Sequence, residues 1–213
     1  MKNKNVKAVI FDFDGTIADT MPFLTRIAVK LITEKYGLSK GEAKHRYLET
    51  TGVDFATQIE IIFPNNPKNH EVVNAFEAKK LECVFELPLF PDVVSTLTHL
   101  KKKSVKTFIC SSTKHEIVLR YCKLKGIYTL VDGIFGYKAG FGKYDQISFI
   151  LKNWRLEPTK VLFIGDSLKD CEFATRNRIN FLGIPRIFKV EDFKKRGAST
   201  IDNLNDLMEV LEE

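Results

Sequence analysis

The chain has 213 residues, of which 44% are hydrophobic and 28% are charged, with a formal net charge of +6. These values are typical of a folded globular protein and exclude disordered and collagen-like chains. No run of 18 apolar residues occurs, and the basic start leads into Asp12 and Asp14 instead of an apolar leader, so we expect no membrane span and a cytoplasmic location.

The positive charge and the cysteines do not indicate a nucleic-acid-binding or zinc-binding protein. The excess of lysine and arginine is dispersed, apart from Lys101-Lys102-Lys103 at the expected end of a helix, where cations interact favourably with the helix dipole. Without a motif that reads bases, this pattern does not favour nucleic acid as a partner. The four cysteines stand far apart, which is typical of buried thiols and not of a metal or redox pair.

Strand and helix patterns alternate along most of the chain. Amphipathic, helix-like segments separate short apolar, β-branched or aromatic runs. The predicted strands are residues 6–13, 105–110, 134–137, 161–165 and 180–184, and the predicted helices between them are residues 93–102, 116–124, 145–154 and 170–177. Such alternation predicts an α/β fold, a Rossmann-like doubly wound parallel sheet with helices on both faces.

A long segment interrupts this alternation after the first strand. The first two predicted strands are about 90 residues apart, far more than one crossover helix needs. Apolar residues in the segment recur at helical spacing. We therefore predict a helical cap domain at residues 19–87, inserted into a core formed by residues 1–18 and 88–213.

Local signals divide this insertion into helices. Pro22 fits a first helical turn, and Gly37 stops the apolar pattern that follows it. Ser39 begins a capping-box spacing, and Asp54 and Asn69 could each cap one further helix. The insertion is thus predicted to contain four helices.

Chemically useful side chains follow four of the predicted strands. Ligands of an open α/β sheet bind outside the carboxyl ends of its strands, so these side chains are expected to meet at one edge. The first strand supplies Asp12 and Asp14, the second Ser111, the loop after the third Lys143, and the fourth Asp166 with Asp170.

The acid pair suits phosphoryl chemistry. Asp12 and Asp14 flank Phe13, so on a strand end their side chains point the same way. One can then act as the nucleophile and the other as the proton donor and acceptor. Clustered carboxylates need a hard cation, and Mg²⁺ fits Asp12, the backbone carbonyl of Asp14 and Asp166. Lys143 and the Ser111 hydroxyl would then face phosphate oxygens.

Each of these residues alone has an ordinary structural explanation. An aspartate at a strand end usually caps a turn or helix, and Asp170 could simply favour a helix dipole. Ser111 is a common turn residue, and a lone lysine is usually solvated. The ordered combination of all of them makes the catalytic interpretation the stronger one.

The chain resembles the haloacid dehalogenase-like (HAD) superfamily of hydrolases over essentially its whole length. The segments that carry the resemblance are "VIFDFDGTIADT", "FICSST", "GFGKYDQI" and "VLFIGDSLKD", with "FPDVVSTLTHLK" resembling the return from the cap. The place of the insertion resembles the helical-cap branch that includes phosphoglycolate phosphatase and β-phosphoglucomutase.

The resemblance implies roles for individual residues. Asp12 would be the nucleophile that forms an aspartyl-phosphate, and Asp14 would protonate the leaving oxygen and then activate water. Ser111 and Lys143 would hold the phosphoryl oxygens, and Asp166 would complete the magnesium site. Asp170 would support that site, so the implied metal-binding residues are Asp12, Asp14, Asp166 and Asp170. Further substrate contacts would come from Gly15, Thr16, Ser112 and Gly52.

Three positions depart from the family pattern. Tyr144 follows Lys143 where proline is frequent, and Asp92 stands where glycine is common, which suggests a local change of turn. The cap loop Thr50-Thr51-Gly52-Val53-Asp54 lacks the arginine with which related mutases grip a second phosphate. This absence weakens the mutase interpretation.

We therefore expect a Mg²⁺-dependent phosphatase that hydrolyses a small phosphomonoester of the phosphoglycolate or sugar-phosphate type. A phosphomutase is the alternative within the enzymes, and a non-enzymatic phospho-acceptor module is a remote one. The expected partner is a small phosphorylated metabolite, with no nucleic acid and no membrane, and nothing in the chain demands more than a monomer, with a dimer as the alternative.

Overall fold

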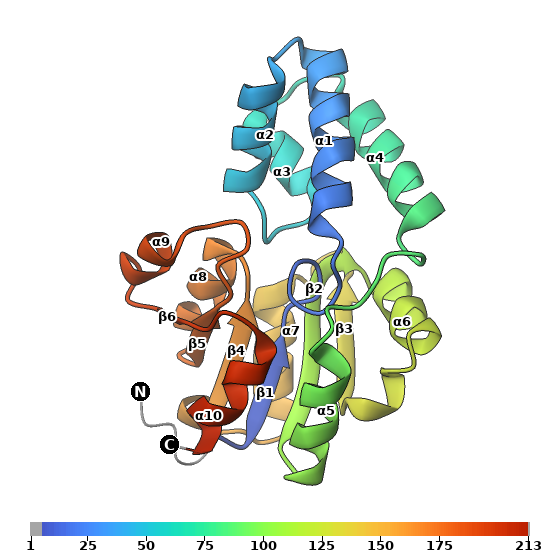
Figure 1. The fold of residues 1–213 in the computed structure, drawn as a ribbon. Coiled ribbons are helices and arrows are strands. Elements are labelled where there is room, and N and C mark those ends of the chain that lie inside the picture. Colours follow the sequence, from blue (N-terminus) through green and yellow to red (C-terminus); the bar gives the residue numbers. More distant parts are fainter. Residues whose placement is uncertain (1–5, 213) are drawn as a thin grey trace.

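A six-stranded parallel sheet forms the centre of the molecule, with strand order β3-β2-β1-β4-β5-β6 (Figure 1). The computed structural model describes residues 6–212, so the first five residues, part of the basic start considered above, lie outside the described chain. The strands are β1 Ala8–Phe11, β2 Lys106–Lys114, β3 Gly133–Tyr137, β4 Val161–Gly165, β5 Asn180–Gly183 and β6 Ser199–Thr200. Every pairing is parallel, which confirms the predicted fold class.

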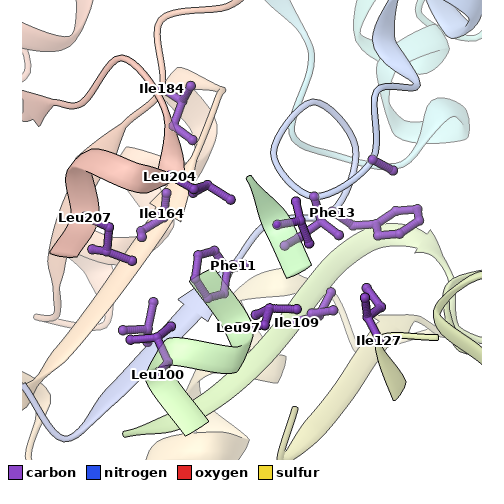
Figure 2. Close-up of a cluster of buried hydrophobic side chains, with 14 of the residues drawn as sticks. Phe11, Phe13, Leu97, Leu100, Ile109, Ile127, Ile164, Ile184, Leu204 and Leu207 are labelled. Atoms are coloured by element: carbon purple, nitrogen blue, oxygen red, sulfur yellow. The ribbon is translucent and has the colours of Figure 1, made fainter. Parts of the chain in front are cut away.

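Both faces of the sheet are buried because the strands alternate their side chains between two apolar layers. Val9 and Phe11 of β1 enter one layer, and Ala8 and Ile10 enter the other. The first layer packs under α5 (Val93–Lys102), α6 (His115–Leu124) and α10 (Leu207–Glu212), and the second under α7 (Lys143–Asn153), α8 (Leu168–Arg176) and α9 (Val190–Lys194). Figure 2 shows Phe11 of the sheet beside Leu97 and Leu100 of α5. This packing fixes the strands whose carboxyl ends carry the polar residues.

Four helices form a separate cluster above those carboxyl ends (Figure 1). They are α1 Met21–Tyr36, α2 Lys40–Glu49, α3 Phe55–Ile62 and α4 Asn69–Cys83. Gly37 ends α1 with φ +76°, Ser39 accepts the Glu42 N–H, and Asp54 accepts the Thr57 N–H. The cluster has its own apolar core, formed by Leu24, Ala28, Ile32, Ala43, Tyr47, Phe55, Ile59, Val72 and Phe76.

One predicted cap is wrong. Lys68, not Asn69, precedes the first residue of α4. The Asn69 amide instead donates to the Phe63 carbonyl at 2.8 Å, and its oxygen accepts from the Tyr36 hydroxyl at 2.7 Å. Asn69 therefore ties α4 to α1 and to the end of α3, a use that its immediate neighbours in the sequence do not indicate.

The sequence also misplaces some boundaries. β2 was predicted to end at Cys110 but continues to Lys114, with a shift in its pairing with β3 along that stretch. The sequence pattern predicts a loop at Lys143, whereas this residue is the first of α7. Of the four cysteines, all free, Cys83 is only half-buried. None of the helices in residues 6–212 is long and apolar enough to cross a membrane.

Asp92 has a function beyond the local turn that was expected. It directly precedes α5, but its Oδ2 accepts the backbone N–H of Leu204 at 2.6 Å, and Thr96 donates to the Leu204 carbonyl at 3.3 Å. These bonds join α5 to the carboxyl-terminal segment. The carboxylate is buried, so its removal leaves a backbone N–H without its partner.

We predict that Asp92→Ala lowers the free energy of unfolding by about 1 to 3 kcal/mol, because a buried N–H loses its acceptor. Asp92→Asn keeps an acceptor oxygen and should cost clearly less. Urea unfolding measures both, with the midpoint expected to fall at unchanged slope. Equal midpoints for the two variants would contradict the assigned bond.

Candidate active site

Asp12 lies directly after β1 and is held against the neighbouring strand. Its backbone N–H donates to the Ile164 carbonyl at 2.8 Å. The next residue, Phe13, is fully buried in the core, so the carboxylates of Asp12 and Asp14 are available at the carboxyl edge of the sheet. Gly15 then turns the chain with φ +84°, a conformation that favours glycine.

Lys143 forms the centre of the charged cluster. Its ammonium group contacts Asp12 Oδ1 and Asp170 Oδ1, each at 2.6 Å, and the residue is only 3% exposed. Burial alone would lower the pKa of Lys143, but the charges of Asp12 and Asp170 raise it above its usual value, so the group stays protonated. The neighbouring Tyr144 packs under Arg176, whose guanidinium carbon lies 4.4 Å from the centre of the tyrosine ring. This packing leaves Lys143 directed at the cluster.

Asp170 supports this arrangement from behind. Its second oxygen, Oδ2, accepts from the Ser167 hydroxyl at 2.6 Å and the Ser167 N–H at 3.3 Å. Both of its carboxylate oxygens therefore have donors, and the side chain is completely buried. Asp170 is thus positioned to hold Lys143 and the start of α8 rather than to face the open space of the site.

Asp166 is the acid whose negative charge has the fewest hydrogen-bond donors and cations around it. Its Oδ2 has no hydrogen-bond partner within residues 6–212, and the residue is 2% exposed. Burial raises the pKa of Asp166 well above its usual range, with further contributions from Asp12 and Asp170. Burial likewise raises the pKa of Asp12 to about 7, although Lys143 opposes the change.

The geometry of these acids fits a hard cation. One oxygen each of Asp12, Asp166 and Asp170 lie within 4.8 Å of one another. A Cβ at Gly15 would come within 2.0 Å of Asp166 Oδ2, so the glycine leaves room beside the unpartnered oxygen. Oxygen donors at this spacing, one of them unpartnered, suit Mg²⁺, which takes few carboxylates and completes its shell with other oxygens.

Asp14 does not belong to that group of acids, because its carboxylate turns toward the four-helix insertion. Thr20 donates to its Oδ1 at 2.7 Å, and the Thr113 hydroxyl donates to its Oδ2. Lys80, from α4, is 5% exposed, and its ammonium group lies 3.7 Å from Oδ2. Lys80 also donates to the Thr113 hydroxyl oxygen.

The two serines of β2 have different environments. Ser111 is buried, and its backbone exchanges two hydrogen bonds of 3.0 Å with the Gln146 amide. Its hydroxyl oxygen accepts the Thr113 N–H at 2.9 Å. Ser112 donates instead to the carbonyl of Gly52, in the loop between α2 and α3, at 2.7 Å.

A cavity of about 60 Å³ lies between these residues and the helical cluster. Six of the ten predicted site residues line it: Asp12, Asp14, Gly52, Ser112, Lys143 and Asp166. Gly15, Thr16, Ser111 and Asp170 lie outside its lining. Sequence reasoning missed five polar residues on its wall, namely Tyr47, Gln58, Glu77 and Lys80 from the helices and Thr113 from β2.

The spacing of Lys80 in the sequence indicates that its side chain is buried. The buried residues of α4 are Val72, Phe76 and Lys80, which recur every fourth position along one face. A lysine in register with an apolar stripe is directed into the protein rather than toward solvent. Thr113 had no such signal, because β2 was expected to end before it.

Comparison with known proteins places the chain in a family. A family model described as "Haloacid dehalogenase-like hydrolase" matches residues 9–184. The chain therefore belongs to the haloacid dehalogenase-like hydrolase family, and the resemblance drawn from the motifs is confirmed, as is the assignment to hydrolases.

Individual relatives agree with this assignment. The chain is 28% identical over 225 residues to a phosphorylated carbohydrates phosphatase of Thermotoga maritima, covering 98% of this chain and 99% of the relative. It is 22% identical over 169 residues to a phosphoglycolate phosphatase of Synechococcus elongatus, covering 79% of each. The fold is similar to that of a predicted phosphatase from Clostridium acetobutylicum, with a TM-score of 0.83 at 18% identity over 98% of this chain and all of that one.

We predict that Gly52→Ala disturbs the contact between the α2–α3 loop and the core. A methyl group there would lie 2.6 Å from Ser167 Oγ and from Lys169 Cβ, at a backbone φ of +102°. Faster backbone hydrogen exchange is expected in residues 50–55 and 112–114, measured by mass spectrometry.

Gly37→Ala is the matched control for this experiment. It has the same kind of left-handed backbone, with φ +76°, but no atom within 4 Å of the added methyl group. The control should show the cost of backbone strain alone, about 1 kcal/mol, without loss of protection at the loop. Equal exchange in both variants would contradict the close approach at Gly52.

Proposed function

We propose that this protein is a Mg²⁺-dependent phosphomonoesterase that works through a phosphorylated Asp12. The observation that carries the proposal is the pairing of Asp12 with Lys143 at 2.6 Å on the wall of the same cavity that a second acid, Asp14, lines. A nucleophilic carboxylate, a buried cation for phosphate oxygens and a separate proton carrier are the groups that two-step phosphoryl transfer needs.

The proposed reaction has two steps. In the first, an oxygen of Asp12 attacks phosphorus, the ester P–O bond breaks, and Asp14 gives a proton to the leaving oxygen. In the second, Asp14 takes a proton from water whose oxygen attacks phosphorus, and the bond from phosphorus to Asp12 breaks. Phosphate leaves, and both carboxyl groups return to their starting forms.

Asp12 and Asp166 would hold Mg²⁺, with the backbone carbonyl of Asp14 as the third protein oxygen and Asp170 in support. When bound, the ion neutralises the carboxylates and the phosphoryl oxygens that must approach them. This agrees with the raised pKa values of Asp12 and Asp166, because burial disfavours the ionised form of each carboxyl group and a bound cation would favour it.

The helical insertion, residues 19–87, is proposed to be a mobile cap. A cavity of about 60 Å³ has room for a few water molecules, so a phosphomonoester enters only when the cap moves away. Cap closure would then exclude bulk water from the phosphoryl group. The names of the relatives support a small phosphorylated metabolite of the phosphoglycolate or phosphorylated-carbohydrate type.

We expect the protein to release phosphate from small phosphomonoesters only with Mg²⁺, and Asp12→Asn to reduce this turnover to background, because the amide is a poor nucleophile. Phosphate release from a substrate panel measures both. The control is Asp145→Asn, which changes a carboxylate that bonds the Gly142 N–H outside the cavity. Retained turnover in Asp12→Asn would sink the assignment of the nucleophile, and isomerised product in place of phosphate would indicate a mutase.

Magnesium is expected to stabilise the folded protein through Asp166. At a concentration near 100 times its dissociation constant, a ligand adds about 2.7 kcal/mol, or roughly 5 to 10 °C in melting temperature for a chain of this size. Asp166→Asn should lose this shift without losing stability in EDTA, because it removes a buried carboxylate whose Oδ2 has no partner among residues 6–212. Thermal melts with and without Mg²⁺ decide the point, and an undiminished shift in the variant would exclude Asp166 as a ligand.

A further inference from the structure

The end of β2 contacts the cap at three consecutive residues. Ser112 donates to the Gly52 carbonyl at 2.7 Å, Thr113 accepts from Lys80 of α4, and Lys114 pairs with Glu77 of α4 at 3.3 Å. We call Ser112–Lys114 the β2 tail. It belongs to the sheet and directly follows Ser111, yet all three of its side chains are engaged with the insertion.

The middle contact continues to Asp14, and its direction is fixed by chemistry. The ammonium group of Lys80 can only donate, so the Thr113 oxygen must accept from it. The single hydroxyl proton of Thr113 is then directed at Asp14 Oδ2. A chain of hydrogen bonds therefore runs from the cap through the β2 tail to the acid that is proposed to carry the proton.

These hydrogen bonds are buried, so they form only in one arrangement of the molecule. Lys80 and Thr113 are each 5% exposed, so Lys80 has given up most of its hydration. An ammonium group taken out of water is costly unless it is paired, and the contacts of Lys80 within residues 6–212 are Thr113 and Asp14. Because Lys80 is carried by α4, this pairing forms only while the cap is docked.

On the basis of the proposed function, we infer that Lys80 and Thr113 are positioning residues that orient the Asp14 carboxyl group for proton transfer to the leaving group. Thr20 holds the other oxygen of Asp14 from the segment that leads into α1. Asp14 is thus held by the core and by both ends of the cap. The proton carrier reaches its working orientation when the cap is closed over a substrate.

The test compares two phosphomonoesters that differ in their need for a proton. Departure of an alkoxide from an alkyl phosphate requires protonation, whereas nitrophenolate leaves p-nitrophenyl phosphate without it. We expect Lys80→Met and Thr113→Val to lower kcat/KM about tenfold or more for the alkyl phosphate and less than about threefold for p-nitrophenyl phosphate. Thr113→Ser, which keeps the hydroxyl group, should restore the alkyl phosphate reaction.

Lys79→Met is the matched control, because it removes the same charge from the same helix. Lys79 is exposed and pairs with Glu82 at 3.0 Å, outside the cavity. Its kcat/KM should stay within about twofold of the wild type for both substrates. A fall in Lys79→Met equal to that in Lys80→Met would show that the effect is one of overall charge, and would overturn the inference.

Hydrogen exchange of the metal-free variants separates positioning from docking. Thr113→Val should keep the protection of α4 within the range of the wild type, since Ser112 and Lys114 still hold the cap. Loss of that protection, or an equal fall in kcat/KM for both substrates, would show that Thr113 and Lys80 only dock the cap. If the wild type hydrolyses neither ester, or Asp12→Asn keeps full turnover, the proposed function fails instead.

Discussion

The buried ammonium group of Lys143 is the interaction on which the site depends. It joins Asp12, at the end of β1, to Asp170, in the first turn of α8, with both contacts at 2.6 Å. Neither acid would be tolerated in this environment without it, because a buried carboxylate with no cation is strongly disfavoured. The lysine in turn keeps its charge only because both acids are present. The charged state of each of these three groups therefore depends on the presence of the other two.

The parallel sheet is what allows this unit to assemble. Its strand order places β1 between β2 and β4, so the residues that follow these three strands meet at one edge. The four-helix insertion follows β1 and ends before β2, which sets it directly over that edge (Figure 1). The β2 tail then extends upward to meet it, at the place where pairing with β3 becomes irregular. The strand ends and the helices α7 and α8 supply the acids and Lys143, and α4 of the insertion supplies Lys80.

The parts of this arrangement that depend on local pattern could be predicted from the sequence. The helix at residues 93–102 has the bounds that its apolar periodicity indicates, and Asp12, Lys143 and Asp166 follow from strand ends and motif spacing. What could not be predicted depends on contacts between distant segments. The length of β2 and the burial of Lys80 depend on contacts between the helical insertion and the end of β2, and the bond from Asp92 to Leu204 joins residues 112 positions apart.

The carboxyl groups of the site outnumber its ammonium groups, which explains why two of the acids have raised pKa values. Four carboxyl groups, Asp12, Asp14, Asp166 and Asp170, meet two ammonium groups, Lys80 and Lys143. If these six groups were all ionised, two negative charges would remain among them, and a bound cation would reduce this excess. Without a cation the balance must come from protons, and the raised pKa values belong to Asp12, which shares its lysine, and Asp166, whose Oδ2 has no donor in the described chain. The two acids that would bind Mg²⁺ are thus the two whose charge the protein itself leaves least compensated.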